Sequence, residues 1–199
     1  MNIIRYVILG IIQGLTEPLP ISSSGHLLIF RELFNTNMFN DLNFEIIVNF
    51  GSFIAILLIF WKDIVKLVTS FFKYLFGKKK ERAKYYDDFK YCMLIVVGSI
   101  PVGIIGLLFK DKIEALASVK EVGIALIVTA ISLFLVKSSN GKKKDKDITY
   151  KDAIIIGLCQ MVALLPGISR SGMTLVGCLL CHLSRESALK YTFMLYFPV

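Results

Sequence analysis

Three uninterrupted apolar stretches alternate with polar segments along the chain. They cover residues 44–61, 91–109 and 121–136. A helix needs about 20 residues to cross the ~30 Å hydrocarbon layer of a bilayer, so each stretch predicts a transmembrane helix, the third a short one. A fourth apolar segment starts near residue 187 and stops with the chain at Val199. We therefore expect an all-α polytopic membrane protein with an incomplete span at its C-terminus.

Two further apolar regions are broken near their middle. Pro18 and Pro20 interrupt residues 3–30, and a Pro-Gly pair at 166–167 interrupts residues 153–183. Neither region suits one straight span, but each suits a re-entrant helical hairpin that enters the membrane and returns. Irregular backbone at membrane depth is tolerated only where protein or a water-filled cavity covers it. The two breaks therefore mark the candidate site.

The two broken regions match each other at a constant offset of 147 residues. Seven of eighteen consecutive positions are identical, and the pairs are Ile8 with Ile155, Gly10 with Gly157, Gln13 with Gln160, Ile21 with Ile168, Ser22 with Ser169, Ser24 with Ser171 and Gly25 with Gly172. Three predicted spans lie between the copies, and three is odd, so the second copy enters from the opposite face. The sequence predicts an inverted-topology repeat whose breaks meet near the bilayer midplane. A chance likeness of two breaks rich in Gly, Pro and Ser is the alternative.

We accordingly expect one integral membrane domain over residues 1–199. Its first repeat covers about 1–136, and its second begins at about residue 152. Residues 1–136 contain a complete span after the break, whereas the second copy stops about nine residues into the matching span. The sequence thus predicts a chain that is truncated at its C-terminus.

Composition and charge support a membrane location. Hydrophobic residues make up 55% and charged residues 19% of the chain, and the mean hydropathy is +0.67; soluble domains carry about 25% charged residues. The net charge of +8 is concentrated in loops, with nine Lys and Arg in 62–90, six in 137–152 and three in 110–120. The positive-inside rule places the first two loops in the cytoplasm. Residues 62–76 alternate lysine with apolar positions and predict a surface amphipathic helix. Without a groove-reading motif, nucleic acid is not an expected partner.

The first break contains ionisable groups, which are costly inside a membrane and are therefore functional candidates. It reads Gln-Gly-Leu-Thr-Glu-Pro-Leu-Pro-Ile-Ser-Ser-Ser-Gly-His from Gln13 to His26. Gln13 lies four residues before Glu17, so the two share a helix face. Amide and carboxylate oxygens are ligands for Mg²⁺ or Ca²⁺, which predicts a divalent cation at Gln13 and Glu17. A water-facing Glu17 at the interface and a purely structural His26 are the alternatives.

Three serines, Ser22, Ser23 and Ser24, precede His26 in the same break. Ser23 and His26 are three residues apart, which places them on one helix face and permits a nucleophile–base pair. Serine is also a common helix cap, so at least one of the three is expected to cap the helix after the prolines and at least one to act chemically.

The second break reads Pro-Gly-Ile-Ser169-Arg170-Ser171-Gly-Met-Thr174. A guanidinium at membrane depth needs an anionic partner, and the fork of Arg170 suits phosphate oxygens. Ser169 and Ser171 lie where a helix is expected to begin, and a helix N-terminus offers free N–H groups to an anion. Two such N-termini would form a pocket for a diphosphate, and phosphoryl transfer needs mainly positioning and charge neutralisation.

These two motifs resemble the signatures of the undecaprenyl-diphosphate phosphatases of the bacitracin-resistance type. The run 13–26 is similar to the first signature and 166–174 to the second, and the resemblance covers essentially the whole chain. It implies a multi-pass enzyme of the bacterial plasma membrane that hydrolyses undecaprenyl diphosphate to the monophosphate and phosphate, recycles the carrier for peptidoglycan synthesis and cell shape, and confers bacitracin resistance. It also implies a site open to the outer face.

The resemblance implies a role for several individual residues. Metal association falls on Gln13 and Glu17, the nucleophile on Ser23, the histidine on His26 and phosphate binding on Arg170. Ser169 and Thr174 also match the family's pattern. A covalent phosphoserine and a metal-activated water both stay open as mechanisms.

Two other functions compete with the hydrolase. A transporter or flippase of polyprenyl phosphate lipids would use the same inverted repeat with broken helices. A structural membrane subunit would need neither Glu17 nor Arg170. The expected partners are a polyprenyl diphosphate lipid and the bilayer, and a homodimer stays open.

Overall fold

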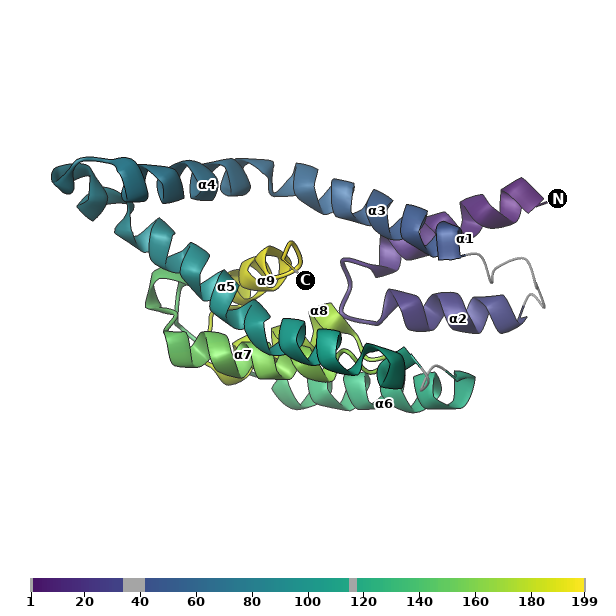
Figure 1. Cartoon of the computed structure of the whole chain (residues 1–199). Helices are drawn as coiled ribbons and strands as arrows, with labels where there is room; N and C mark the ends of the chain where they lie inside the picture. Colours follow the sequence, from purple (N-terminus) through teal and green to yellow (C-terminus); the bar gives the residue numbers. More distant parts are fainter. Residues whose placement is uncertain (1, 34–41, 115–117, 199) are drawn as a thin grey trace.

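The computed structural model describes residues 2–33, 42–114 and 118–198, and these ranges are helical without a β-strand (Figure 1). The helices in chain order are α1 (Asn2–Thr16), α2 (Ser23–Leu33), α3 (Leu42–Ile59), α4 (Trp61–Phe76), α5 (Lys79–Glu114), α6 (Val119–Val136), the short 3₁₀ helix η2 (Asp145–Asp147), α7 (Tyr150–Val162), α8 (Arg170–Leu180) and α9 (Arg185–Met194). The all-α prediction is confirmed.

Two segments of the described chain are long and apolar enough to cross a bilayer. They are Arg82–Phe109 within α5 and Val119–Val136, and they contain the stretches 91–109 and 121–136. Residues 79–108 of α5, which precede the non-helical Phe109, correspond to about 45 Å of helix, more than the ~30 Å thickness of the hydrocarbon layer. It continues through Pro101 and leaves helical geometry only at Phe109.

The remaining predicted elements are also helices. Helix α3 occupies the stretch 44–61 but ends at Ile59, and α4 starts after the single residue Phe60 and covers the predicted amphipathic segment 62–76. Helix α9 begins close to residue 187, where the incomplete span was expected. Prolines and serines therefore break the chain where the apolar pattern indicated.

The main core lies between α5, α7, α8 and α9. Helices α5 and α7 approach so closely that a Cβ on Gly157 would lie 2.4 Å from the carbonyl oxygen of Gly98. Tyr191 of α9 is fully buried beside them, and its hydroxyl donates a 2.6 Å hydrogen bond to the Leu94 carbonyl of α5. A smaller cluster around Leu9 and Leu27 joins α1, α2 and α3. Helix α8 thus packs in the larger core cluster, whereas α2 packs in the smaller one.

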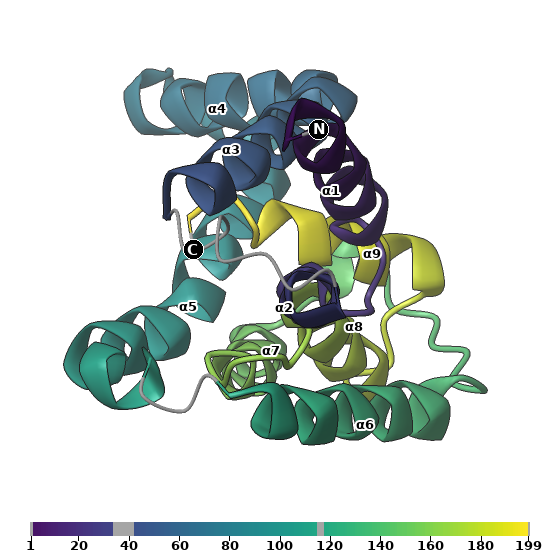
Figure 2. The same ribbon diagram turned by 90° about the vertical axis from the view of Figure 1, so that its right-hand side faces the viewer.

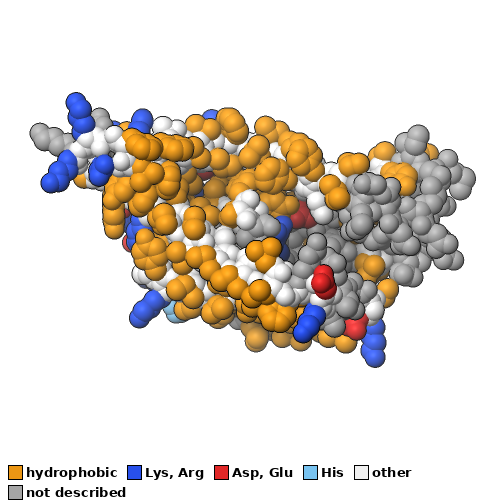
Figure 3. All heavy atoms as spheres, viewed as in Figure 1, with side chains coloured by type: hydrophobic (Ala, Val, Ile, Leu, Met, Phe, Trp, Pro, Cys, Tyr) orange, Lys and Arg blue, Asp and Glu red, His pale blue; other side chains and the backbone are white. Residues whose placement is uncertain are grey.

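Apolar side chains cover much of the outer surface. Leu107, Leu135 and Ile59 are each more than 70% exposed, and hydrophobic side chains spread over the face in Figure 3. Soluble monomers rarely expose a continuous apolar surface on this scale. Acidic and basic atoms are nevertheless visible in a hollow near the middle of this face. The surface is that of a membrane protein with a polar interior site.

Candidate active site

The first break is a tight turn between α1 and α2. The Thr16 hydroxyl donates to the Ile12 carbonyl at 2.7 Å as α1 ends. Ser22 then adopts a left-handed backbone with φ of 65°, which is uncommon for a residue other than glycine. Its Oγ accepts a 3.3 Å hydrogen bond from the Gly25 N–H, so Ser22 caps α2. Ser23 is therefore the first residue of the helix.

The second break, between α7 and α8, also ends at a capping serine, although Ser169 has an extended backbone. Ser169 caps α8, since its Oγ accepts a 3.0 Å hydrogen bond from the Gly172 N–H. Gly167 precedes it with φ of +88°, and a Cβ there would lie 2.8 Å from Cα of Val122. Helix α6 holds this turn further through Thr129, whose Oγ accepts from the Ser169 N–H at 3.2 Å. Only glycine satisfies both the conformation and the space at position 167.

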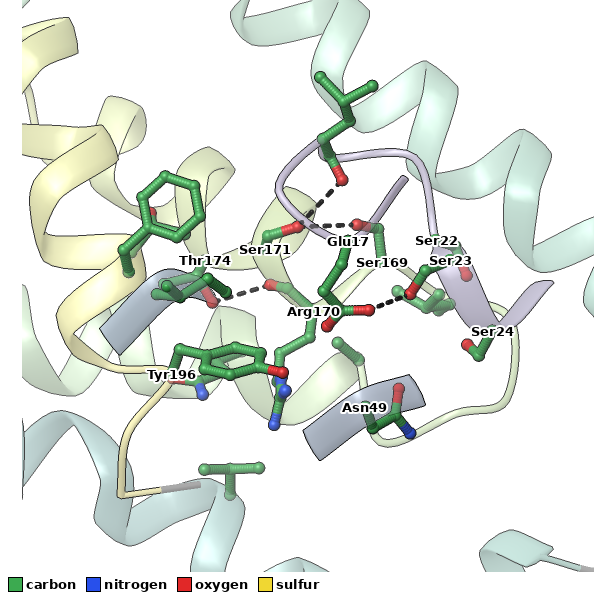
Figure 4. A pocket seen from close by; sticks show the side chains of 18 of the residues that line it. Glu17, Ser22, Ser23, Ser24, Asn49, Ser169, Arg170, Ser171, Thr174 and Tyr196 are labelled. Carbon is green, nitrogen blue, oxygen red and sulfur yellow. Dashed lines mark hydrogen bonds between the residues drawn. The ribbon is translucent and has the colours of Figure 1, made fainter. Parts of the chain in front are cut away.

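The two breaks lie against each other, although they are far apart in the sequence. Ser171 Oγ donates to the Leu19 carbonyl at 3.3 Å, and a Cβ on Gly172 would lie 3.1 Å from the Pro20 carbonyl. Figures 1 and 2 both place the start of α2 close to α8, and Figure 4 shows the residues that meet there. Ser23 and Arg170, each the first residue of its helix, are separated by the same 147 positions as the repeat.

A cavity of about 400 Å³ opens between the breaks and brings together most of the predicted site. Its lining includes these predicted residues: Glu17, Ser22, Ser23, Ser24, Ser169, Arg170, Ser171 and Thr174. Thr174 is buried and its hydroxyl donates to the Arg170 carbonyl at 2.8 Å, which ties it to the first turn of α8. Neither Gln13 nor His26 lines the cavity.

Glu17 is the centre of a hydrogen-bond network on one side of this cavity. Ser23 Oγ donates to Glu17 Oε2 at 2.5 Å. The Gln13 amide nitrogen donates to the same carboxylate oxygen at 2.7 Å and to Asn49 Oδ1 at 2.7 Å. Asn49 belongs to α3, so three helices position the carboxylate. A carboxylate that accepts from a hydroxyl is poised to remove its proton.

Arg170 lies in the same cavity, and its N–H donors are not paired with a carboxylate of the described chain. Its guanidinium carbon is 4.4 Å from the centroid of the Tyr196 ring, a cation–π arrangement visible in Figure 4. Within the described chain, no carboxylate lies at ion-pairing distance from it. The guanidinium therefore lies over a ring, and its N–H groups are not bound to a carboxylate of the described chain.

His26 lies outside this arrangement. Its Nδ1 and the Ser22 carbonyl oxygen form a 2.8 Å hydrogen bond, and the hydroxyl of Ser23 is directed to Glu17. The Ser23–His26 pair expected from their spacing is therefore not formed in this structure. Ser23 is bonded to Glu17 instead of His26, and a chemical role of His26 stays a prediction.

The sequence argument did not predict several other lining residues, among them Asn49, Gln160 and Tyr196. Gln160 aligns with Gln13 in the repeat, and that pairing was the available signal. Both glutamines are about 1% exposed, and both have an Oε1 atom without a hydrogen-bond partner. Asn49 and Tyr196 lie within apolar stretches, where nothing in the local pattern distinguishes them.

The oxygen atoms around Glu17 are compatible with a divalent cation. The described residues contain no cluster of three His, Cys, Asp or Glu side chains. Ser23 Oγ lies 2.5 Å from the carboxylate, and the buried Oε1 of Gln13 lacks a partner, although the Gln13 amide nitrogen rather than Oε1 faces Glu17 and Asn49. Mg²⁺ is commonly held by one or two carboxylates together with substrate phosphates, and a divalent cation at Gln13 and Glu17 stays a prediction.

Comparison with known proteins now adds to the geometry. The sequence profile of the family described as bacitracin resistance protein BacA matches residues 6–199. The chain belongs to the BacA family. It is 45% identical over 201 residues to an undecaprenyl-diphosphatase of Oceanobacillus iheyensis. This match covers 100% of this chain and 72% of the relative.

Other BacA relatives are similar to the same extent. Undecaprenyl-diphosphatase 2 of Bacillus thuringiensis is 46% identical over 198 residues, covering 99% of this chain and 72% of the relative. The undecaprenyl-diphosphatase of Acholeplasma laidlawii is 42% identical over 202 residues, covering 98% and 72%. The resemblance noted from the two motifs is therefore confirmed over essentially the whole chain.

Proposed function

We propose that this BacA chain hydrolyses undecaprenyl diphosphate to undecaprenyl phosphate and phosphate, and that the cavity between the two breaks is its active site. The observation that carries the proposal is the Ser23–Glu17 hydrogen bond, which faces Arg170 across one cavity. The names of its relatives give the same activity. Such hydrolysis recycles the lipid carrier of peptidoglycan synthesis and confers bacitracin resistance.

The residues of α8 bind the diphosphate. The free N–H groups of Arg170 form paired hydrogen bonds to the oxygens of the terminal phosphate. The N-terminus of α8 adds its positive dipole end and unpaired backbone N–H groups, and so does the N-terminus of α2 opposite. Ser24, Ser171 and Thr174 line the cavity and complete its polar wall.

Ser23 and Glu17 carry out the bond change. Ser23 Oγ attacks the terminal phosphorus while its proton passes to Glu17 Oε2, and the P–O bond to undecaprenyl phosphate breaks as that monophosphate leaves. Glu17 passes this proton to the departing monophosphate. Water then attacks the phosphoserine and gives a proton to Glu17, which returns it to Ser23 Oγ as the bond to phosphate breaks. A direct attack by water is the competing route, and Ser23→Ala separates the two.

Glu17, together with oxygens of Gln13 and Asn49, would hold a divalent cation, Mg²⁺ or Ca²⁺. Bound there, the ion supplies neutralisation of the charge on the phosphate oxygens. The chain's own contribution is to keep the carboxylate oriented, which the hydrogen bonds from Gln13 and Ser23 achieve.

The assay is phosphate release from a polyprenyl diphosphate in detergent, with and without EDTA. Glu17→Gln and Arg170→Ala are each expected to lower turnover at least ~100-fold, since each removes a group that interacts with the developing charge. Ser132→Ala is the matched control, because Ser132 is an exposed serine of α6 that bonds only to its own helix. Full activity in either site variant would refute this site, and full activity in EDTA would refute the cation.

The repeat accounts for the position of the site. Two re-entrant hairpins, α1–α2 and α7–α8, enter from opposite faces of a single membrane domain covering residues 1–199, and α3, α5 and α6 span it. Matching caps at Ser22 and Ser169 and matching buried glutamines support this arrangement. The loops 62–90 and 137–152 then face the cytoplasm and the cavity faces outward.

The orientation is testable in a cysteine-free background. Lys142→Cys is expected to react with an impermeant maleimide only after cell lysis, and Ser24→Cys is expected to react in intact cells. The opposite pattern would reverse the topology. Association into a homodimer stays a prediction.

A flippase of polyprenyl phosphate would need only the anion-binding half of this cavity. The paired Ser23 and Glu17 favour the hydrolase, because transport requires no hydroxyl bonded to a carboxylate. Lipid translocation without phosphate release by the wild-type chain would favour the transporter.

A further inference from the structure

The hairpin of α4 and α5 carries a second polar cavity, of about 730 Å³, which shares no lining residue with the first. Four lysines line it, namely Lys62, Lys66, Lys73 and Lys84. Two acidic residues, Asp87 and Asp88, line it as well, so the cavity has an excess of positive charge. In Figure 1 this hairpin projects from the rest of the molecule, and Figure 3 shows basic side chains at that end.

Asp88 is already satisfied within the cavity. It accepts a hydrogen bond from Lys66 Nζ at 3.1 Å and another from Ser70 Oγ at 2.8 Å. This carboxylate neutralises Lys66 and is not free to pair with the other lysines. The unpaired positive charge therefore belongs to the remaining members of the cluster.

Lys73 and Lys84 lie at one aromatic ring of the cavity. Their Nζ atoms lie 5.3 Å and 5.7 Å from the centroid of the same Tyr85 ring. Neither has a carboxylate at ion-pairing distance within the described chain. Two ammonium groups near one ring place like charges in one part of the cavity, and each keeps its three N–H donors for an acceptor. A phosphate in the cavity would accept from them and neutralise this charge.

The position of the cavity indicates which molecule would supply that phosphate. Trp61 and Val65 line the cavity and are about half exposed, and α4 also exposes Phe72 and Phe76. A helix with lysines on one face and large apolar side chains on the other lies in the plane of the membrane interface. Tryptophan is enriched at the same level. The lysine cavity therefore lies where phospholipid headgroups are found.

We propose that the α4–α5 hairpin binds the headgroup of an anionic phospholipid in the adjacent leaflet. Lys73 and Lys84 hold its phosphate, Tyr85 keeps the two ammonium groups in place, and Trp61 lies beside the glycerol and the upper acyl chain. The site is separate from the hydrolytic cavity and does not depend on its chemistry.

The chain offers a direct reporter, because Trp61 is its single tryptophan. The full-length protein is placed in vesicles that contain brominated phosphatidylglycerol or brominated phosphatidylcholine at equal mole fraction. Bromine quenches tryptophan by contact, so the ratio of quenching reports the preference for the anionic lipid. We expect a preference of about fivefold to tenfold at low salt, weaker at 0.5 M NaCl, since one lysine near an anionic surface contributes about fivefold.

Lys73→Gln with Lys84→Gln is expected to abolish the preference. The matched control is Lys142→Gln with Lys151→Gln, which removes the same charge from exposed lysines of another basic segment and should keep it. Equal quenching by both lipids in the wild-type chain, or equal loss in both double variants, would overturn the proposal. Inorganic phosphate added at constant ionic strength is expected to have no effect, and loss of the preference there would assign the site to free phosphate instead.

Discussion

Replacing Tyr196 tests whether the ring beneath Arg170 prepares the guanidinium for the diphosphate. The guanidinium carbon lies 4.4 Å from the ring centroid, and no acidic group holds this arginine in the described chain. A desolvated cation–π contact is worth ~0.5–2 kcal/mol. That range corresponds to a factor of ~2 to ~30 in binding. Tyr196→Leu is therefore expected to raise KM for a polyprenyl diphosphate about tenfold, with a smaller change in kcat.

Tyr196→Phe separates the ring from the hydroxyl. It keeps the aromatic face and is expected to remain within about threefold of the wild-type chain. Phe193→Leu is the matched control, because Phe193 lines the same cavity but packs on Phe60 rather than on Arg170. Initial rates of phosphate release over a substrate series give KM and kcat, and a melting curve in detergent checks folding. Equal losses in Tyr196→Phe and Tyr196→Leu, or a wild-type KM in the latter, would refute a role for the ring.

Three further outcomes are expected. Ser23→Ala should abolish turnover if the phosphoserine forms, and rapid-quench labelling from a β-³²P diphosphate should mark the wild-type chain only; residual turnover above a few per cent would favour direct attack by water. Gly157→Ala should lower the melting temperature by several degrees because its Cβ would lie 2.4 Å from a backbone oxygen, whereas Gly10→Ala, with its nearest neighbour at 3.9 Å, should not. Asp152→Asn should cost about 1–3 kcal/mol at pH 7, because Asp152 accepts from Lys143 Nζ at 2.9 Å.

The pH dependence of that last variant follows from the carboxyl group of Asp152. Burial opposes its ionisation, but hydrogen bonds from Thr149 and Lys143 outweigh the burial and lower its pKa. A carboxyl with a lowered pKa stabilises the fold above its unfolded value of about 3.9 and loses that contribution as the pH falls through the folded value. Melting curves of Asp152→Asn and the wild-type chain should therefore differ at pH 7 and converge below pH 4. A constant difference down to pH 3 would contradict this reasoning.

The helices could be predicted because residues close to their ends determine where they begin and end. The chain leaves helical structure around the prolines at 18, 20 and 166, although α5 continues through Pro101, and Ser22 and Ser169 cap the helices that follow. For the long apolar stretches, length alone was enough to predict a helix. The end of α3 was placed two residues too late, since Phe60 and Trp61 are as apolar as the residues of a span and the chain turns there without a Pro or Gly signal.

The partners within the site could not be predicted in the same way. A spacing of three residues suggested Ser23 with His26, which presumes that both lie well inside one helix. Ser23 is instead the first residue of α2, and side chains on a helix lean toward its N-terminus. Its hydroxyl therefore reaches back over the turn to Glu17. Asn49 and Tyr196 join the cavity through packing between distant segments, which no local pattern encodes.

The repeat explains why the two key groups of the cavity face each other. Ser23 and Arg170 occupy equivalent positions, each the first residue after a capping serine. Glu17 is equivalent to Leu164, and both line the cavity. The scaffold thus presents the same helix start twice, once with the hydroxyl and its carboxylate and once with a cation beside an apolar wall. In the proposed hydrolysis, the first copy of the repeat contributes the proton acceptor Glu17 and the second copy contributes the phosphate-binding charge of Arg170, so the site needs both copies.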